Sequence, residues 1–212
     1  MSVQQLLDLV KNENFVFIQP HDFPDPDAIA AAYGLQSLLG LKGIKSYLVY
    51  EGEIQRDSLK NMIRDLDIHI NKPGEYEMIK THKIIIVDGC KGNDNVSNLI
   101  GEEIGVIDHH EAKNPEKVPY VDIRSDYGSC STIIFSYFTE LKLKIPPNVA
   151  NALFIGLNLD TARMTRKVSD ADIRAYAGLY KRVDDKYVQS KLRNNIELKI
   201  WFFFNMSSLT SR

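Results

Sequence analysis

The stretch KIIIVDGC, residues 83–90, decides how this chain folds. Five residues of strand type end abruptly in Asp88 and Gly89, which is typical of a buried strand that stops at a polar turn. The stretch IGVIDHHE, residues 104–111, has the same form, because its strand-like run leads directly into Asp108. Each stretch therefore predicts a buried strand with acidic side chains at its carboxyl end.

Strand-like and helical segments alternate through the rest of the first two thirds of the chain. The pattern predicts strands at 15–18 and 47–50 and helices at 3–11, 28–40 and 56–66. Such alternation is typical of an α/β fold in which helices flank a parallel β-sheet. Beyond about residue 127 the remaining segments have helical spacing, so we expect a helical C-terminal part.

Composition and charge narrow the classes of protein. The 212 residues are 44% hydrophobic and 25% charged, which is typical of a globular chain with a real core. Lys and Arg total 26 against 28 for Asp and Glu, and a net charge of -2 disfavours binding to duplex nucleic acid. With two cysteines, no secretory signal and no long apolar run, we expect a cytoplasmic protein that does not bind a membrane.

Acidic and imidazole side chains follow three of the predicted strands. They are His21, Asp25 and Asp27 after the first, Asp88 after the strand at 83–87, and Asp108, His109 and His110 after the strand at 104–107. Ligands of open α/β sheets bind at the carboxyl ends of strands. Carboxylates gathered there repel one another unless cations neutralise them. Carboxylate and imidazole donors without thiolate suit Mn²⁺ or Mg²⁺, and the candidates outnumber the ligands of one ion. A pair of such ions would promote hydrolysis of a phosphoester or phosphoanhydride.

Four motifs, in order, resemble the signature motifs of the DHH family of phosphoesterases. They are HDFPDPDA at 21–28, VDGC at 87–90, VIDHHE at 106–111 and LDTARMTR at 159–166. The resemblance, which extends to RecJ-like and oligoribonuclease or pAp-phosphatase members, implies a DHH phosphoesterase domain over residues 1–185. Members of this family usually carry a second, C-terminal domain with a glycine-rich segment that contains a histidine. Here no histidine follows His110 and Gly178 is the last glycine, so the resemblance implies that residues 186–212 form a helix or linker toward such a second domain.

The resemblance also assigns roles by position. It implies that two Mn²⁺ ions, with Mg²⁺ as the alternative, hold a nucleophilic water between them. The first ion would be held by His21, Asp25 and Asp88, and the second by Asp27, the shared Asp88, His109 and Asp160. His110 would stabilise charge on the phosphate, and Asp108 would orient its neighbours. Arg163 and Arg166, in the fourth motif, either contact the substrate or lie at the surface.

Several functions remain open at this point. The leading hypothesis is hydrolysis of short oligonucleotides or of small nucleotide phosphates such as 3′,5′-bisphosphonucleosides. The alternatives are an inorganic pyrophosphatase or exopolyphosphatase, and a non-catalytic module that binds metal and nucleotide. The apolar run IWFFF at 200–204 would pack on the core, face a second domain or make a homo-oligomer contact. For individual acids the plainer reading is a structural one, with Asp25 and Asp27 capping the following helix.

Overall fold

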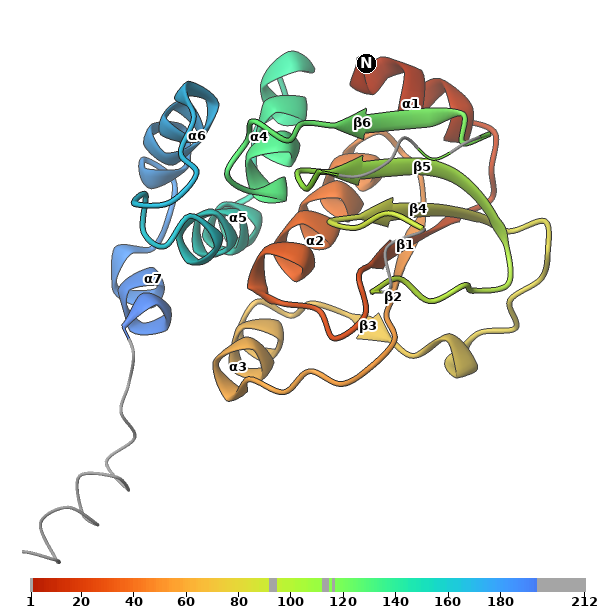
Figure 1. The fold of residues 1–212 in the computed structure, drawn as a ribbon, viewed down its shortest axis with the longest axis horizontal. Coiled ribbons are helices and arrows are strands. Elements are labelled where there is room, and N and C mark those ends of the chain that lie inside the picture. The colour runs from red at the N-terminus through yellow and green to blue at the C-terminus, as the bar shows by residue number, and fades with distance from the viewer. Residues whose placement is uncertain (1, 92–94, 112–114, 116, 194–212) are drawn as a thin grey trace, which may run out of the picture.

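A computed structural model describes residues 2–91, 95–111, 115 and 117–193. Within them six parallel strands form one sheet in the order β3-β2-β1-β4-β5-β6 (Figure 1). The strands are β1 (Val16–Pro20), β2 (Ser46–Val49), β3 (Ile70–Asn71), β4 (Lys83–Val87), β5 (Glu102–Asp108) and β6 (Tyr120–Ile123). The helices are α1 (Val3–Val10), α2 (Pro26–Leu41), α3 (Asp57–Asp65), η1 (Pro73–Glu75, a 3-10 turn), α4 (Cys130–Glu140), α5 (Pro147–Asp160), α6 (Asp170–Tyr180) and α7 (Asp185–Leu192). This arrangement confirms the predicted α/β fold with a helical C-terminal part.

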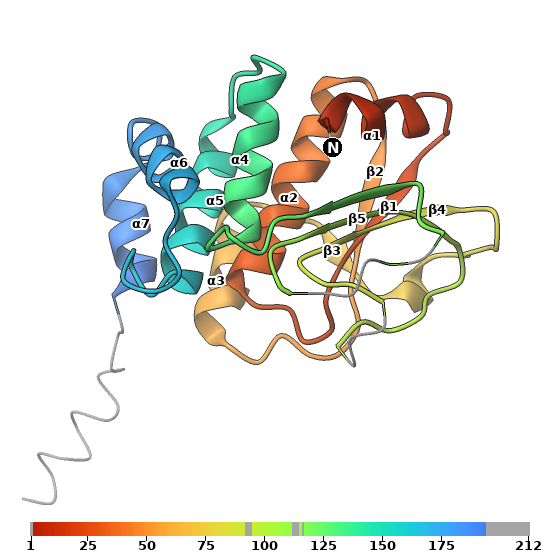
Figure 2. The same cartoon turned by 45° about the horizontal axis from the view of Figure 1, so that its top comes forward.

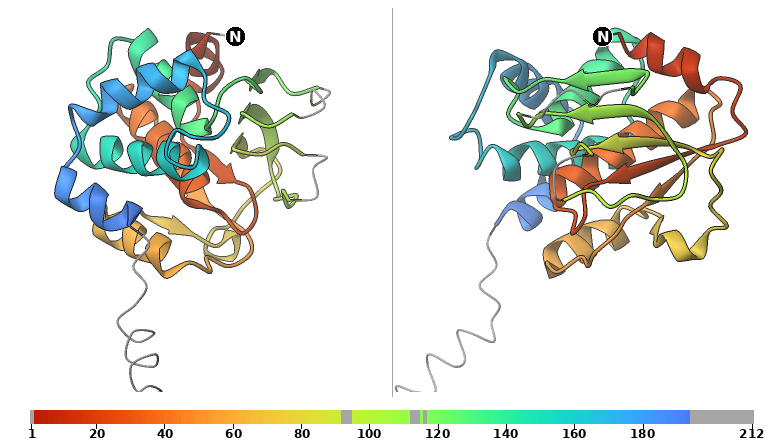
Figure 3. Two further views of the ribbon diagram at one scale, coloured as in Figure 1. Left: turned by 60° about the vertical axis from the view of Figure 1, so that its left-hand side comes forward. Right: turned by 45° about the vertical axis from the view of Figure 1, so that its right-hand side comes forward.

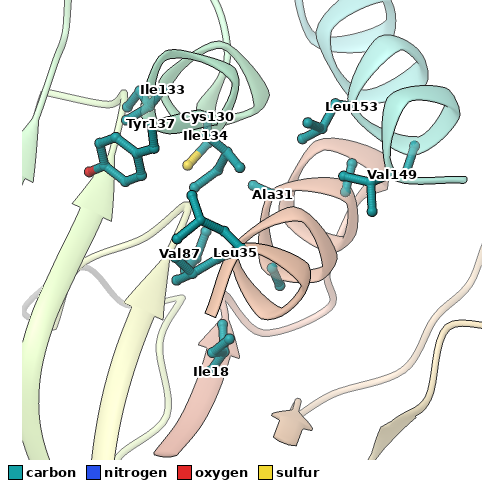
Figure 4. Packing of buried hydrophobic residues seen from close by; sticks show 14 of the residues in the cluster. Ile18, Ala31, Leu35, Val87, Cys130, Ile133, Ile134, Tyr137, Val149 and Leu153 are labelled. Atoms are coloured by element: carbon teal, nitrogen blue, oxygen red, sulfur yellow. The ribbon is translucent and has the colours of Figure 1, made fainter. Parts of the chain in front are cut away.

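The main core lies between one face of the sheet and the helices, which gather on the same side of the strands (Figures 2 and 3). Alternate strand residues point into it, among them Ile18, Val87 and Ile107, because side chains alternate between the two faces of a strand. Helix α2 packs there against the strands, and α4 and α5 pack against α2. In Figure 4, Leu35 of α2 lies between the sheet and Ile134 of α4.

Connecting segments, not helices, cover the opposite face of the sheet. Phe17, Ile86 and Val106 pack there against Tyr76 and Val96, both of which lie outside the strands. Both faces of the central strands are therefore buried, which explains why their sequences read as continuous apolar runs. Among the described residues, no helix combines the length and apolarity that a membrane crossing requires.

Two strands escape the sequence prediction, and both are edge strands. β3 has two residues and pairs only with β2. β6, of sequence YVDI, carries the buried Asp122, which accepts hydrogen bonds from the Arg124 guanidinium (2.7 Å) and the Tyr137 hydroxyl (2.6 Å). That acid interrupts the apolar pattern by which the central strands are recognised.

The predicted boundary between residues 185 and 186 stays a prediction. Helix α7 spans it, and Val188 of α7 is buried in the main core. Residues 194–212, which include the run at 200–204, lie outside the described residues.

Helix α5 ends in an unusual turn. After the cap residue Thr161, the three residues Ala162, Arg163 and Met164 all adopt left-handed backbone conformations, with φ of 48°, 58° and 62°. For a residue with a β-carbon this conformation costs roughly 1–2 kcal/mol, and the position just after a helix cap favours glycine for that reason.

Replacing Ala162 by glycine should therefore stabilise the protein. We expect Ala162→Gly to raise the free energy of unfolding by about 0.5–1 kcal/mol, because relief of the left-handed strain exceeds the backbone entropy that glycine loses on folding. The control is Ala177→Gly, an equally exposed position inside α6, which should lower it by about 1 kcal/mol. Urea unfolding measures both, and a destabilised Ala162→Gly protein would contradict the strain assignment.

Candidate metal centre

The predicted site residues leave the sheet at one level. Pro20, Val87 and Ile107 are paired across β1, β4 and β5, so the residues that follow them emerge side by side. From β1 the chain adds β2 and β3 on one side of the sheet and then β4, β5 and β6 on the other side. Such a switch point between β1 and β4 opens a crevice at the carboxyl ends of these strands. Parallel pairing thus brings together side chains that lie almost 90 positions apart in the sequence.

The predicted ligands form three overlapping groups. They are His21, Asp25 and Asp88; Asp27, His109 and Asp160; and Asp88, His109 and His110. Within each group one donor atom per residue lies within 4.8 Å of the others. The first group is the ligand set predicted for the first ion. The second group is the set predicted for the second ion, without the shared Asp88.

Asp88 belongs to the first group and also faces His109 of the second group. Its Oδ2 is 3.8 Å from Nε2 of His21, while its Oδ1 is 3.3 Å from Nε2 of His109. The backbone supports this position: φ is 60°, and the N–H donates to the Ile107 carbonyl (2.8 Å). Asp88 Oδ1 and His109 Nε2 are buried, and each lacks a hydrogen-bond partner among the described residues. Unsatisfied buried donors and acceptors are costly, so this pair of atoms fits a role as ligands of a divalent cation.

Asp27 is held by the start of helix α4, a contact that the sequence did not reveal. Its two carboxylate oxygens accept hydrogen bonds from the backbone N–H groups of Cys130 (2.7 Å) and Ser131 (3.1 Å). The partial positive charge of a helix N-terminus favours a carboxylate there. Gly156 of α5 makes room for it, since a β-carbon on Gly156 would lie 2.8 Å from Asp27 Oδ1. Helices α4 and α5 therefore fix Asp27 from two sides.

His109 is oriented through its second ring nitrogen. Nδ1 lies 3.3 Å from the Tyr127 carbonyl, so the tautomer that donates to this carbonyl leaves Nε2 free. Nε2 points at Asp160, 3.2 Å from Oδ2. A backbone carbonyl behind the ring is the usual way in which proteins orient an imidazole that binds a metal.

Asp108 and His110 form a separate pair beside this cluster. One Asp108 oxygen accepts hydrogen bonds from the backbone N–H groups of His109 (2.8 Å) and His110 (3.1 Å) and contacts Nδ1 of His110 (2.9 Å). The hydrogen bond to Asp108 raises the pKa of His110. The Asp108 side chain is fully buried, whereas the His110 side chain is half exposed and reaches solvent.

The remaining predicted residues are less uniform in position. Asp25 caps α2 through Oδ1, which accepts from the N–H groups of Asp27 and Ala28, so it is a helix cap and a member of the cluster at once. Arg166 donates to the Asp160 carbonyl (2.6 Å) and lies beside the cluster. Arg163 instead donates to the Leu192 carbonyl of α7 and lines a cavity of about 460 Å³ among α5, α6 and α7.

A proton on His109 offsets part of the negative charge within the cluster. Burial acts to lower the pKa of His109, but the surrounding carboxylates, Asp88 foremost, raise it to about 10. Burial and the nearby Asp88 hold the pKa of Asp27 well above its usual value. Burial acts in the same direction on Asp88, but the imidazoles, His109 first, keep its pKa below the usual value. The cluster therefore attracts positive charge, which a divalent cation would supply in place of the proton.

Asp172 supports the site from outside the signature motifs. It is fully buried and forms the capping box of α6 with Ser169. Its oxygens also accept hydrogen bonds from the Gly128 N–H (2.9 Å) and the Thr132 hydroxyl (2.5 Å). The segment held in this way contains the carbonyl behind His109 and leads into the N–H groups that bind Asp27.

Residues 15–157 match the model of the DHH family, N-terminal domain, and the chain belongs to this family. An uncharacterised protein of Methanocaldococcus jannaschii is 31% identical over 182 residues, which are 86% of this chain and 37% of that protein. A probable manganese-dependent inorganic pyrophosphatase of Streptococcus thermophilus is 28% identical over 167 residues, 76% of this chain and 53% of the relative. The resemblance drawn from the four motifs is thus confirmed.

A solved structure shows the same fold. The crystal structure of an exopolyphosphatase-related protein from Bacteroides fragilis superposes with a TM-score of 0.69 at 21% identity, over 92% of this chain and 61% of that one. The chain therefore spans less than two thirds of the length of each of these proteins.

Metal binding should release a proton from His109. Below its pKa of about 10 the imidazole is protonated in the metal-free protein, whereas a metal ligand needs the neutral ring. We therefore expect Mn²⁺ affinity to rise with pH, by about tenfold per unit between pH 6 and 8 for this one proton. Calorimetric titration in buffers of different ionisation enthalpy counts the protons, and release of none would contradict the assignment.

Asp172→Asn should weaken the site although residue 172 is not a ligand. The amide would direct N–H groups at existing donors, so we expect a loss of stability of about 2–3 kcal/mol and weaker Mn²⁺ binding in the folded protein. Ser2→Ala breaks the exposed capping box of α1 and is the matched control. It should cost about 1 kcal/mol and leave Mn²⁺ affinity unchanged. Urea unfolding and Mn²⁺ titration decide, and unaltered affinity in Asp172→Asn would exclude the positioning role.

Proposed function

We propose that this chain binds two divalent cations, Mn²⁺ by preference, and uses them to hydrolyse a phosphoester bond. The position of Asp88 carries the proposal, because its two oxygens face histidines of different donor groups. The first ion would be held by His21, Asp25 and Asp88. The second would be held by Asp27, Asp88, His109 and Asp160. Ions shared through one carboxylate lie close enough to act on the same phosphoryl group.

The chain's own groups have distinct tasks in this scheme. Two bound cations lower the pKa of water and neutralise charge on a phosphoryl group. The N-terminus of α4 keeps the buried Asp27 in place, and the Tyr127 carbonyl keeps the free nitrogen of His109 directed at the cluster. His110 reaches solvent with Asp108 behind it, so it is placed to donate a hydrogen bond to the substrate as negative charge develops.

We propose small nucleotide phosphates or short oligonucleotides as the substrates. The net charge of -2 disfavours a long polyanion, which would need an extended basic surface. Arg166, beside Asp160, offers a local positive charge at the edge of the cluster. Arg163 contributes less to this proposal, because its guanidinium contacts α7.

A second candidate is hydrolysis of pyrophosphate or of a longer polyphosphate. It is favoured by the Streptococcus thermophilus relative, which is named as a probable manganese-dependent inorganic pyrophosphatase. The same donor groups would serve the anhydride, because two-metal hydrolysis acts on either bond.

Asp88→Asn should remove most of the activity. An amide cannot give two anionic oxygens to a pair of cations, so we expect turnover to fall at least 100-fold and one Mn²⁺ ion to be lost. Asp67→Asn is a closely matched control, because Asp67 also has a left-handed backbone, with φ of 54°, but is exposed and lies outside the donor groups. Its activity should be unchanged.

The measurement is turnover of 3′,5′-bisphosphoadenosine, a dinucleotide and pyrophosphate by the 212-residue chain, with and without Mn²⁺. Release of phosphate or mononucleotide only with Mn²⁺ supports the proposal, and the preferred substrate separates its two forms. Normal turnover by Asp88→Asn would overturn the shared-ligand assignment. Nucleotide binding without any turnover would instead favour a non-catalytic module.

A further inference from the structure

An exposed aromatic side chain lies inside the first motif. Phe23 is two residues from His21 and two residues from Asp25, which belong to the same donor group. Its side chain is 58% exposed, although phenylalanine is normally buried. The first motif therefore places a large apolar ring close in sequence to the charged cluster and partly in solvent.

Two loops fix Phe23 in this position. The Phe23 N–H donates to the Glu51 carbonyl (3.1 Å), which lies in the loop after β2. The ring rests against Gly52, where a β-carbon would come within 2.7 Å of Phe23 Cγ. Gly52 also has a left-handed φ of 72°, so both its conformation and its lack of a side chain suit this contact. The ring is therefore placed by the backbone of a neighbouring loop.

The backbone of Phe23 is itself strained. Its φ of 52° lies in the left-handed region, which bulky residues rarely adopt. Strain of this kind is concentrated at binding and catalytic sites, where the surrounding structure imposes it. An asparagine or glycine would adopt this conformation more easily, so ease of folding does not account for the aromatic side chain.

A hollow lined by two lysines and by Glu53 adjoins the same loop. A cavity of about 400 Å³ is lined by Tyr50, Gly52, Lys60 and Lys72, among other residues. The Lys72 ammonium lies 4.1 Å from the centre of the Tyr50 ring and donates to the Gly52 carbonyl. Gly52 thus contacts the Phe23 ring and also lines a hollow that contains Tyr50 and Lys72.

We propose that Phe23 is a stacking platform for the planar ring of a nucleotide whose phosphate lies at the metal centre. The inference rests on the proposed two-metal function and narrows its substrate to a phosphate joined to an aromatic base. Any of the nucleobases can stack on an exposed aromatic ring, because each has a flat aromatic face.

Binding of two reaction products tests the platform without requiring turnover. The probes are AMP and inorganic phosphate, titrated calorimetrically into the Mn²⁺-loaded chain. We expect the unaltered chain to bind AMP about tenfold more tightly than phosphate, because only AMP carries a base. Phe23→Ala should abolish this difference, and Phe23→Trp, which retains an aromatic face, should preserve it.

Ile100→Ala is the control variant, since Ile100 is also 58% exposed but lies before β5, at the opposite end of that strand from Asp108. It should keep the tenfold preference for AMP. Equal affinities for AMP and phosphate in the unaltered chain, or a preference that survives Phe23→Ala, would overturn the platform. Failure of the two-metal function is seen separately, as lack of Mn²⁺-dependent turnover of any of the three substrates named above.

Discussion

Mutual repulsion among buried carboxylates is the constraint on which the rest of this structure depends. Asp25, Asp27, Asp88 and Asp160 come from three separate parts of the chain, and two of them, Asp27 and Asp88, are buried while the other two are partly exposed. In such a cluster carboxylates cannot all stay ionised without positive partners. Protonated His109 supplies one such charge, the N-terminus of α4 supplies a partial one, and the remainder fits divalent cations.

The fold can be understood as the frame that enforces this meeting. The parallel strands β1, β4 and β5 end at the same level, which brings His21, Asp88 and Asp108 to one edge of the sheet. Both faces of these strands are buried, and this packing holds the edge in place. Helices on a single face then supply what strands cannot. The start of α4 reaches Asp27, and the end of α5 brings Asp160 to His109. A sheet alone would expose the acids to water, where they would need no cation.

Sequence reasoning recovered the elements whose signals are local. The apolar runs of β4 and β5 and the acids that end them were read directly. It missed β6, where the buried Asp122 depends on an arginine and a tyrosine for its partners. It also missed the contact between α4 and Asp27, because 103 positions separate the N–H donor from its acceptor and no periodicity records such a pairing. The motifs of the family supplied the proposed ligands, whereas the α4 N–H groups behind Asp27 and the Tyr127 carbonyl behind His109 became visible only in three dimensions.

Backbone strain is distributed in the same way as function. Nine described residues other than glycine have left-handed backbones, and five of them, Phe23, Asp88 and the turn 162–164, lie at or within four positions of a proposed ligand. Ala162 in that turn, and Asp67 and Lys142 among the others, directly follow helix caps, where this conformation is ordinary. Strain at the ends of helices satisfies carbonyl groups and needs no further cause. Neither Phe23 nor Asp88 follows a helix. At both residues the left-handed backbone directs the side chain to a place that a relaxed backbone would not reach. Glycine or asparagine would adopt these conformations at lower cost, so backbone stability alone does not account for a phenylalanine and an aspartate there.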